Sequence, residues 1–297
     1  LKGDVDVRQA FGRVDQLAFR LANDKVRTGL SAGLLHRQKH LVPPHLLRQL
    51  RVGRTGVWEQ NVKANGLGLV AVTNSHHFGV AGHYVEAAAR AGYISLLFGN
   101  TPAAMPMVGG SKAIFGTNPL AAGFPTGKAD PLVIDMSLSA VARGKLLVAA
   151  KNGQAIPEGW ALTADGKPTT DPQEGLKGLM VPLGGDKGAL LALIVELLVV
   201  GLSGSRFSYE ADSFFDPKGN RPRIGQLILT IDPGLAGANI FAGRINDFLG
   251  VLDGDVGTRL PGQRRFQQRA AGLKSGVTVS DVVVEEIQAG IRQSWTE

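Results

Sequence analysis

Two adjacent histidines, His76 and His77, are the side chains whose type and position most directly suggest chemistry in this sequence. Residues 67–72, which precede them, form a nearly continuous apolar run of the length of a buried strand. Residues 80–91, which follow them, carry apolar side chains at helical spacing. A loop between a strand and a helix gathers side chains around ligands, and the free N–H groups of the helix attract anions. Because the positive helix end disfavours a charged imidazole, we expect His77 to stay neutral and to accept a proton.

A second candidate group follows the apolar run of residues 132–134, which predicts a short strand that ends in the acid Asp135. An acid at the end of a strand can accept hydrogen bonds from a ribose, and neighbouring N–H groups suit a phosphate. The serines Ser137 and Ser139 are typical of a helix start, so residues 136–145 are predicted to begin a helix. Asp135 could equally be a plain helix cap, and its spacing leaves both interpretations open.

A third candidate group is the run Gly184-Gly185-Asp186-Lys187, which precedes the apolar residues 189–202. Glycines at a helix start expose backbone N–H groups to a phosphate, and a lysine adds one mobile cation. The alternative is an ordinary helix-capping turn with a surface lysine. The sequence contains neither a Walker motif nor a G-x-G-x-x-G run, so neither a P-loop nor an ordinary Rossmann site is predicted.

A fourth group is arginine-rich, because residues 259–265 contain three guanidinium groups and no acid. Such a cluster suits bidentate recognition of a phosphate. It is equally typical of a solvated basic helix start.

The composition limits the class of protein. The chain has 297 residues, of which 44% are hydrophobic and 19% charged, as in globular proteins of one large or two modest domains. It has no cysteine, which excludes disulfides and thiolate metal sites. Residues 189–202 form the longest apolar run, but Glu196 interrupts it and it is too short to span a bilayer, so it predicts a core helix. The N-terminus lacks a signal-peptide pattern, and we expect a cytoplasmic protein without membrane contact.

The net charge of +7 comes from residues 1–65, where twelve basic residues face five acidic ones. Nucleic-acid binding is one interpretation, but a solvated helical face is favoured because no aromatic pattern accompanies the charge. His36, His40 and His45 lie in the same region without a nearby carboxylate, so no metal site is predicted.

The ordered motifs together carry a family resemblance. They are residues 74–79, 115–119, 135–137, 142–145, 168–172, 182–188 and 259–262. In this order they resemble the malate/L-lactate dehydrogenase family, which is unrelated to the Rossmann-type enzymes and includes sulfolactate dehydrogenases and Δ1-piperideine-2-carboxylate reductases. The likeness covers residues 66–269 and implies an α/β, non-Rossmann fold with a largely antiparallel central sheet and flanking helices. It also implies a homodimer and hydride transfer between NADP or NAD and C2 of a small 2-hydroxy or cyclic 2-imino acid.

The resemblance also assigns roles to individual residues. The residues expected to hold the cofactor are His77, Phe78, Gly79, Val80, Ala81, Asp135, Met136, Ser137, Asp186, Lys187, Arg259, Pro261, Gly262, Arg264 and Arg265. The residues expected to face substrate are Thr117, Arg143 and Gly144, and the catalytic candidates are His77, His36 and Lys145. NADPH is favoured over NADH because Arg264 and Arg265 could pair with a 2′-phosphate.

Two departures from the family pattern affect these roles. Much of the family has an N-terminal Ser-His-Gly, where this chain has Leu35-His36-Arg37, so His77 is the stronger acid–base candidate. Lys145 is typical of the hydroxy-acid dehydrogenases, whereas residues 207–212 and 225–228 resemble the imino-acid reductases. The substrate class therefore stays divided, and a family member that binds cofactor without catalysis is a further alternative.

The expected organisation has three parts. Residues 1–65 form a basic helical region, residues 66–258 an α/β core that binds cofactor and substrate, and residues 259–297 a helical segment with a cofactor-contacting turn.

Overall fold

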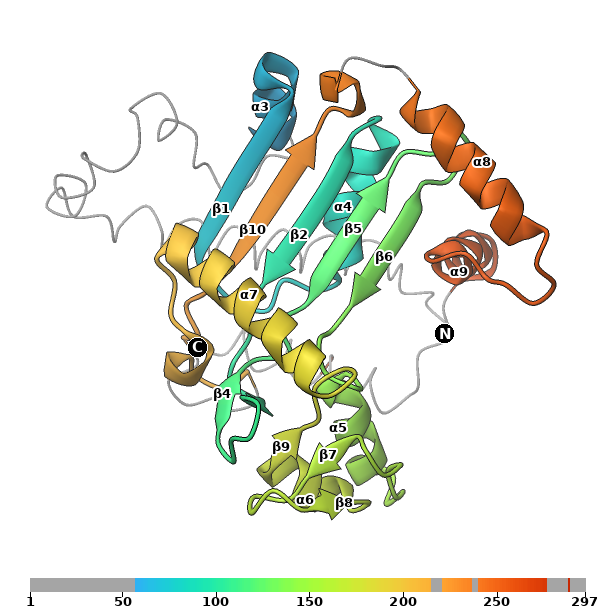
Figure 1. Cartoon of the computed structure of the whole chain (residues 1–297). Coiled ribbons are helices and arrows are strands. Elements are labelled where there is room, and N and C mark those ends of the chain that lie inside the picture. The colour runs from blue at the N-terminus through green and yellow to red at the C-terminus, as the bar shows by residue number, and fades with distance from the viewer. Residues whose placement is uncertain (1–56, 215–220, 237–239, 277–287, 289–297) are drawn as a thin grey trace, which may run out of the picture.

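The computed structural model describes residues 57–214, 221–236, 240–276 and 288 (Figure 1). Most of the basic helical region predicted for residues 1–65, the end of the helical segment predicted for residues 259–297, and the candidate His36 lie outside the described residues. The described helices are α3 (Val57–Asn65), α4 (Ala81–Arg90), α5 (Arg143–Lys151), α6 (Pro172–Lys177), α7 (Asp186–Ser203), η2 (Ser208–Glu210), η3 (Pro233–Ala236), α8 (Phe241–Asp253) and α9 (Gln263–Ser275). The described strands are β1 (Leu67–Ser75), β2 (Ile94–Gly99), β3 (Met105–Pro106), β4 (Ala113–Phe115), β5 (Leu120–Phe124), β6 (Leu132–Met136), β7 (Ala161–Leu162), β8 (Pro168–Thr169), β9 (Leu179–Met180) and β10 (Ile224–Ile231).

A five-stranded sheet in the order β1-β10-β2-β5-β6 organises the described chain (Figure 1). Every pair of neighbouring strands is antiparallel, which confirms the largely antiparallel sheet expected from the sequence. Strands β1, β2 and β6 therefore run in one direction, and β10 and β5 run in the other. We call the edge at which β1, β2 and β6 end the site edge, because His77 and Asp135 both lie there.

Helices α4 and α7 cover opposite faces of the sheet (Figure 1). Helix α4 packs on β2, β5 and β6, with Val85 against Leu97, Ala121 and Val133. A side chain at Gly123 would collide with the backbone carbonyl of Val85, so glycine permits this close approach. Helix α7 packs on β10, β1 and β2.

The helix α7 matches the apolar run at residues 189–202, but it is not a fully buried core helix. Its inner side chains, such as Ala192, Val195 and Val199, join a buried cluster with Leu227 of β10. Its opposite side is exposed in the described structure, so burial of the run was predicted correctly for one side only.

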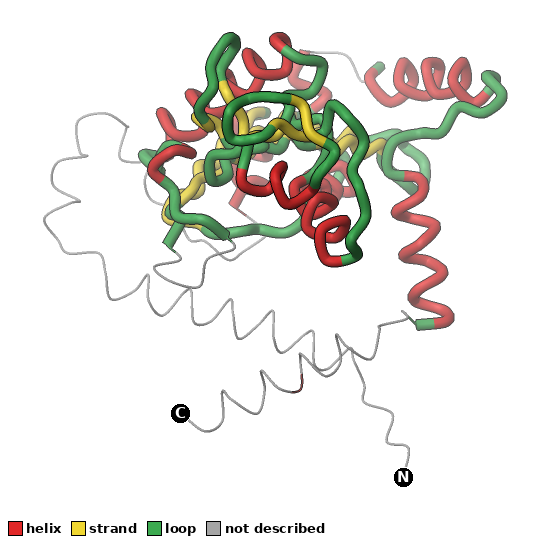
Figure 2. The backbone as a smooth tube through the Cα atoms, turned by 90° about the horizontal axis from the view of Figure 1, so that it is seen from below, coloured by secondary structure: helices red, strands yellow, loops and turns green. Residues whose placement is uncertain are grey.

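A small lobe follows β6 and contains α5, α6 and the three-stranded sheet β8-β7-β9. Strands β7 and β8 pair antiparallel, with Ala161 opposite Thr169 and Leu162 opposite Pro168. Helices α8 and α9 lie beside the β6 end of the sheet, where Figures 1 and 2 show them projecting from the body of the fold.

The predicted helix start at the serines is wrong. Helix α5 begins at Arg143 and has Ala142, not a serine, at its N-cap. The Ser139 hydroxyl instead donates to the carbonyl of Val141 at 2.7 Å, and Ser139 pairs with Pro182 in an isolated β-bridge. The serines therefore stabilise the turn that joins β6 to α5.

Candidate functional site

The loop between β1 and α4 carries both histidines and confirms the predicted strand-to-helix junction. Both imidazoles are exposed, and each ring centroid lies 5.3 Å from that of Phe214. The N–H of Gly79 donates to Nδ1 of His77 at 3.1 Å. Because Nδ1 accepts this bond, the neutral ring of His77 carries its proton on Nε2.

Phe78 fixes the path of this loop along the site edge. Its ring packs over Gly99 at the end of β2, where an added Cβ would come within 3.1 Å of the ring. Gly79 has φ +81°, a conformation that favours glycine. The hydroxyl of Tyr84 donates to the carbonyl of Phe78 at 2.9 Å, so the first turn of α4 holds the loop in place.

Asp135, at the end of β6, lies beside the N-terminus of α4. Its Oδ2 accepts the N–H of Gly82 at 2.7 Å. Asp135 therefore caps a helix 53 residues earlier, and not the helix that follows it. Strands β1 and β6 are the two outer strands of the sheet, and both end at the site edge. The loop after β1 leads to α4, whose N-terminus lies beside Asp135.

The arginines of α9 anchor that helix on α4. Arg269 donates to both oxygens of Glu86 at 2.8 and 2.7 Å, and Arg90 donates to the same carboxylate at 2.8 Å. Glu86 is only 3% exposed. Burial alone would raise the pKa of Glu86, but the hydrogen bonds from Arg269 and Arg90 outweigh it and lower the pKa to about 2.

The predicted cofactor arginines divide between this anchor and the surface. Arg265 lies 3.5 Å from Glu86 and near the N-terminus of α4, where a side chain at Gly82 would collide with it. Arg259 and Arg264 are exposed, and α9 begins after Gly262, which has φ +87°. Helix anchoring therefore accounts for Arg265 and Arg269, and Arg259 and Arg264 stay at the surface.

Backbone hydrogen bonds bring Thr117 and the start of α7 to the same region. The carbonyl of Thr117 accepts the N–H of Leu138 at 2.8 Å, and the carbonyl of Leu138 accepts the N–H of Leu183 at 2.9 Å. The N–H of Thr117 donates to Oγ1 of Thr101 at 2.9 Å. The turn after β6 therefore lies between the loop before β5 and the segment that enters α7.

The N-terminus of α7 is open to an anion. Gly184 and Gly185 have φ +65° and +69°, and a Cβ on either would meet no described atom within 4 Å. Within the described residues no side chain caps this helix, and Asp186 and Lys187 are exposed. An anion can therefore reach the free backbone N–H groups with a lysine beside them.

The start of α5 faces a hollow of its own. Lys145 lies over the ring of Trp160, with Nζ 5.6 Å from the centroid, and both side chains line a hollow of about 370 Å³ together with Gly144. Arg143 donates to the carbonyl of Leu176 at 2.8 Å, and burial lowers the pKa of its guanidinium. His77 is not among the residues that line this hollow.

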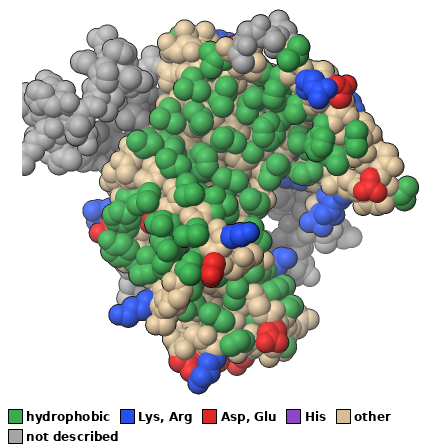
Figure 3. Space-filling model, in the orientation of Figure 1, with side chains coloured by type: hydrophobic (Ala, Val, Ile, Leu, Met, Phe, Trp, Pro, Cys, Tyr) green, Lys and Arg blue, Asp and Glu red, His purple; other side chains and the backbone are tan. Residues whose placement is uncertain are grey.

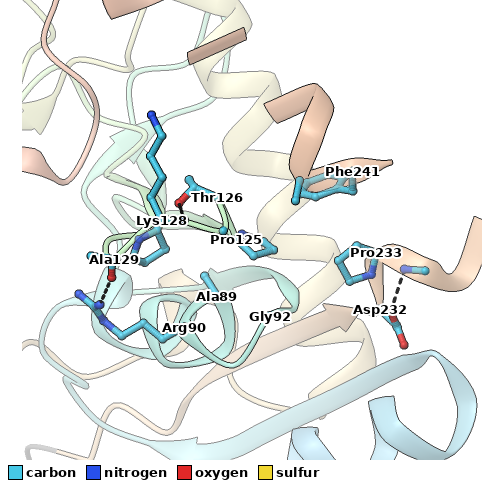
Figure 4. A pocket seen from close by; sticks show the side chains of 14 residues that line it. Ala89, Arg90, Gly92, Pro125, Thr126, Lys128, Ala129, Asp232, Pro233 and Phe241 are labelled. Carbon is cyan, nitrogen blue, oxygen red and sulfur yellow. Dashed lines mark hydrogen bonds between the residues drawn. The ribbon is translucent and has the colours of Figure 1, made fainter. Parts of the chain in front are cut away.

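A larger hollow, of about 570 Å³, lies at the opposite edge of the sheet (Figure 4). Pro125, Phe241 and Asp232 line it, and Lys128 stands at its side. The guanidinium of Arg90 donates hydrogen bonds to the carbonyl of Ala129 and to the carboxylates of Glu86 and Asp130. None of the predicted site residues lines this hollow.

A buried polar network supports the site edge and was missed by the sequence analysis. Glu196, on the inner side of α7, accepts the Nδ2 group of Asn118 at 2.8 Å. It also accepts the backbone N–H and the hydroxyl of Ser208 at 2.6 and 2.7 Å. Asn118 has φ +31° and directly follows Thr117. A lone glutamate in an apolar helix was the available signal, because a buried carboxylate requires donors.

Among the residues that the structure describes, no group of three His, Asp or Glu side chains could hold a metal ion. No helix in this part of the chain combines the length and apolarity needed to cross a bilayer.

Comparison with known proteins places these features in a family. The family model for malate/L-lactate dehydrogenase matches residues 58–288. This chain belongs to the malate/L-lactate dehydrogenase family. The (2R)-3-sulfolactate dehydrogenase (NADP(+)) of Chromohalobacter salexigens is 48% identical over 232 residues, which cover 76% of this chain and 68% of the relative. The Δ1-pyrroline-2-carboxylate/Δ1-piperideine-2-carboxylate reductase of Pseudomonas putida is 40% identical, over 74% of this chain and 64% of the relative.

Solved structures of the malate/L-lactate dehydrogenase family agree. The crystal structure of Δ1-piperideine-2-carboxylate reductase from Pseudomonas syringae pv. tomato matches with a TM-score of 0.72 and 35% identity, over 77% of this chain and 69% of that one. The sulfolactate dehydrogenase of Methanocaldococcus jannaschii matches with a TM-score of 0.68 and 33% identity, over 76% and 67%. The family and fold expected from the sequence are thereby confirmed, and this chain spans about two thirds of the length of these relatives.

Proposed function

We propose that this protein is an NADP-dependent oxidoreductase that transfers hydride to or from C2 of a small 2-hydroxy/2-oxo acid or cyclic 2-imino acid. The observation that supports this proposal is that the His77 loop and Thr117 lie along the site edge, and that backbone bonds join the Thr117 segment to the one that enters the uncapped start of α7. The names of the relatives at 48% and 40% identity supply the cofactor and both substrate types.

In this proposal, groups at the N-termini of α7 and α4 bind the cofactor. The backbone at Gly185 and the ammonium of Lys187 bind phosphate oxygens, because they combine free N–H groups with a cation. Asp135 keeps Oδ2 on α4 and offers Oδ1 to a ribose hydroxyl. Arg264 and Arg259 are exposed near this end and favour the 2′-phosphate of NADPH. When bound, the reduced nicotinamide supplies the hydride.

His77 exchanges the proton that accompanies hydride transfer. When hydride adds to C2 of an oxo acid, the electron pair of the C=O bond moves to oxygen, which then takes a proton from the imidazolium. A ring that exchanges its proton at Nε2 must keep the other proton on Nδ1, which is incompatible with the Gly79 bond. We therefore expect the ring of His77 to leave the N–H of Gly79 when substrate binds.

Substrate recognition falls to Thr117, Arg143 and Gly144, which bind the carboxylate through a hydroxyl, a guanidinium and the N-terminus of α5. Lys145 favours a hydroxy acid as the substrate. The relative at 48% identity is also named for a hydroxy acid, sulfolactate. His36 is a second candidate for the proton carrier, and its segment lies outside the described residues.

The experiment is a panel of 2-oxo acids and cyclic imino acids, assayed with the purified protein by the absorbance of NADPH and of NADH. Turnover of any member, with the lower dissociation constant for NADPH, supports the proposal. NADPH fluorescence that reports binding without turnover of any substrate would contradict it and would favour a cofactor-binding protein without catalysis.

We also propose that two copies of the chain form a homodimer and that this homodimer acts in the cytoplasm. The absence of cysteine fits a reducing compartment. Fractionation of cells tests the compartment, and sedimentation velocity tests the dimer.

A further inference from the structure

Among the residues that the structure describes, Gln226 on β10 carries a buried amide donor without an acceptor. Its side chain is 5% exposed, and Nε2 is buried with no hydrogen-bond partner in the described chain. A buried donor without an acceptor destabilises a fold, so such a group in a native protein requires an explanation. Gln226 begins the part of β10 that lies nearest the site edge, which suggests a ligand as that explanation.

Gln226 lies on the α4 side of the sheet. Leu227 joins the buried cluster under α7, so by alternation Gln226 and Ile228 point to the opposite face, where Ile228 packs against the cluster under α4. Figure 3 shows that hydrophobic side chains gather over α7 and the neighbouring sheet, on the face that Gln226 does not reach. The amide therefore belongs to the face on which the His77 loop passes into α4.

The immediate neighbours of Gln226 cannot satisfy its amide. In the sheet it lies between Val72 of β1 and Gly99 of β2. A Cβ built on Gly99 would lie 3.1 Å from the ring of Phe78 and 3.6 Å from Cγ of Gln226, so the ring and the amide stem lie side by side over that glycine. None of these three neighbours has a side-chain hydrogen-bond acceptor. His77 directly precedes Phe78, so the amide lies beneath the segment that carries the proposed proton carrier.

The strand order indicates which end of a dinucleotide would reach Gln226. Asp135, the proposed partner of a ribose, lies on β6, and β10 is three strands away, or about 14 Å from the spacing of strands. Helix α9, which carries the exposed Arg264, lies beside the β6 end of the sheet (Figure 1). An extended cofactor with its 2′-phosphate at α9 therefore directs its nicotinamide toward β10 and the His77 loop.

We propose that Gln226 binds the carboxamide of the nicotinamide and thereby orients C4 toward the substrate. Two amides are complementary, because Nε2 donates to the carboxamide oxygen while Oε1 accepts from the carboxamide NH2. The ring of Phe78 must turn aside for this contact. The hydroxyl of Tyr84 binds the backbone carbonyl of Phe78, so the ring can turn without breaking that bond. The inference rests on the proposed function and adds the residue that sets the orientation of the nicotinamide.

Calorimetric titration with oxidised cofactors tests this contact without turnover. In the 3-acetylpyridine analogue of NADP, a methyl group replaces the NH2 of the carboxamide, so only the bond to the oxygen remains. The parent protein should bind NADP about 2–10-fold more tightly than the analogue, the effect of one neutral hydrogen bond. Gln226→Met, which has a similar length and volume, should weaken NADP about 5–100-fold and should bind the two cofactors equally. A parent protein without this preference, or a variant that keeps it, would overturn the proposal.

Urea unfolding without cofactor separates this role from a structural one. Because Nε2 has no acceptor in the described fold, Gln226→Met and Gln226→Leu should keep the urea midpoint of the parent or raise it. A lower midpoint for both variants would show that the amide stabilises the fold through another partner, and would overturn the proposal. Gln173→Met, at an exposed position on α6, is the matched control and should change neither the affinities nor the midpoint.

The outcomes also separate this contact from the proposed function. Turnover of a 2-oxo or imino acid, together with an unchanged cofactor preference in Gln226→Met, would refute the contact alone. A preference for NADP that Gln226→Met abolishes, without turnover of any substrate by the parent, would refute hydride transfer alone. Failure of the parent to bind NADP in the titration would refute both.

Discussion

Removing the carboxylate of Glu196 should destabilise the protein more than any other single change to its polar groups. In Glu196→Ala, the backbone N–H and the hydroxyl of Ser208 lose their acceptor, while Asn118 keeps its bond to the carbonyl of Ala192 at 3.1 Å. The hydroxyl can rotate to a new partner, but the backbone N–H cannot. Leaving one or two buried donors unsatisfied costs about 1–3 kcal/mol each, so we expect a loss of about 2–5 kcal/mol.

The measurement is urea unfolding followed by circular dichroism, with the free energy taken from the midpoint and slope. Glu196→Gln should lose less, about 1–3 kcal/mol, because its carbonyl oxygen still accepts one bond while its amide meets another donor. Glu158→Gln, at an exposed position, is the control and should stay within about 0.5 kcal/mol of the parent. If Glu196→Leu were as stable as the parent, the free-energy cost of burying the carboxylate would cancel the stabilisation from its hydrogen bonds. That result would refute the expected net stabilisation by Glu196.

Four further predictions concern cofactor, catalysis and pH. His77→Ala should lower kcat about 10²–10⁴-fold while the NADPH dissociation constant changes little, and full activity would remove His77 from the mechanism. Lys187→Ala should raise that dissociation constant about tenfold, because one charge-assisted bond to phosphate is lost. Arg264→Ala should weaken the binding of NADPH but not of NADH, as measured by the two dissociation constants. An equal loss of affinity for both cofactors would exclude contact between Arg264 and the 2′-phosphate. In the folded protein the pKa of Glu86 is about 2, lower than the ordinary value of 4.5, so its ionised carboxylate contributes its full stabilisation above pH 4.5. The urea midpoint should therefore fall as the pH drops from 4.5 to 2, and Glu86→Gln should make the midpoint less dependent on pH in this range.

Local patterns predicted the elements well, and contacts distant in sequence escaped them. The apolar run before His77 and the helical spacing after it specified β1 and α4, because both signals are periodic within a short window. The role of Asp135 could not be resolved, since its partner Gly82 lies on an element that only the folded sheet brings near. The serines before α5 were misjudged for a related reason: their hydroxyls bond within the turn and do not cap the helix.

The same limit applies to the arginines near the end of the described chain. Their clustering favoured phosphate and helix-start interpretations equally, and neither included the anchoring of α9 by Glu86 on α4. The pair of Glu86 with Arg90 has helical i,i+4 spacing, but its pair with Arg269, 183 residues later, has no periodic signature. Family resemblance supplied the expected roles of these residues, and the geometry separates Arg264, which is exposed, from Arg265, which lies at the anchor.

The strand order has a consequence for how the chain is made. Strand β10 lies between β1 and β2 but follows them by more than a hundred residues, so a growing chain presents both strands with unpaired backbone groups on facing sides. Open strand edges of this kind promote association with other chains. Synthesis must reach residue 231 before the gap closes, and a polypeptide truncated ahead of β10 should therefore aggregate even though most of its other elements are present.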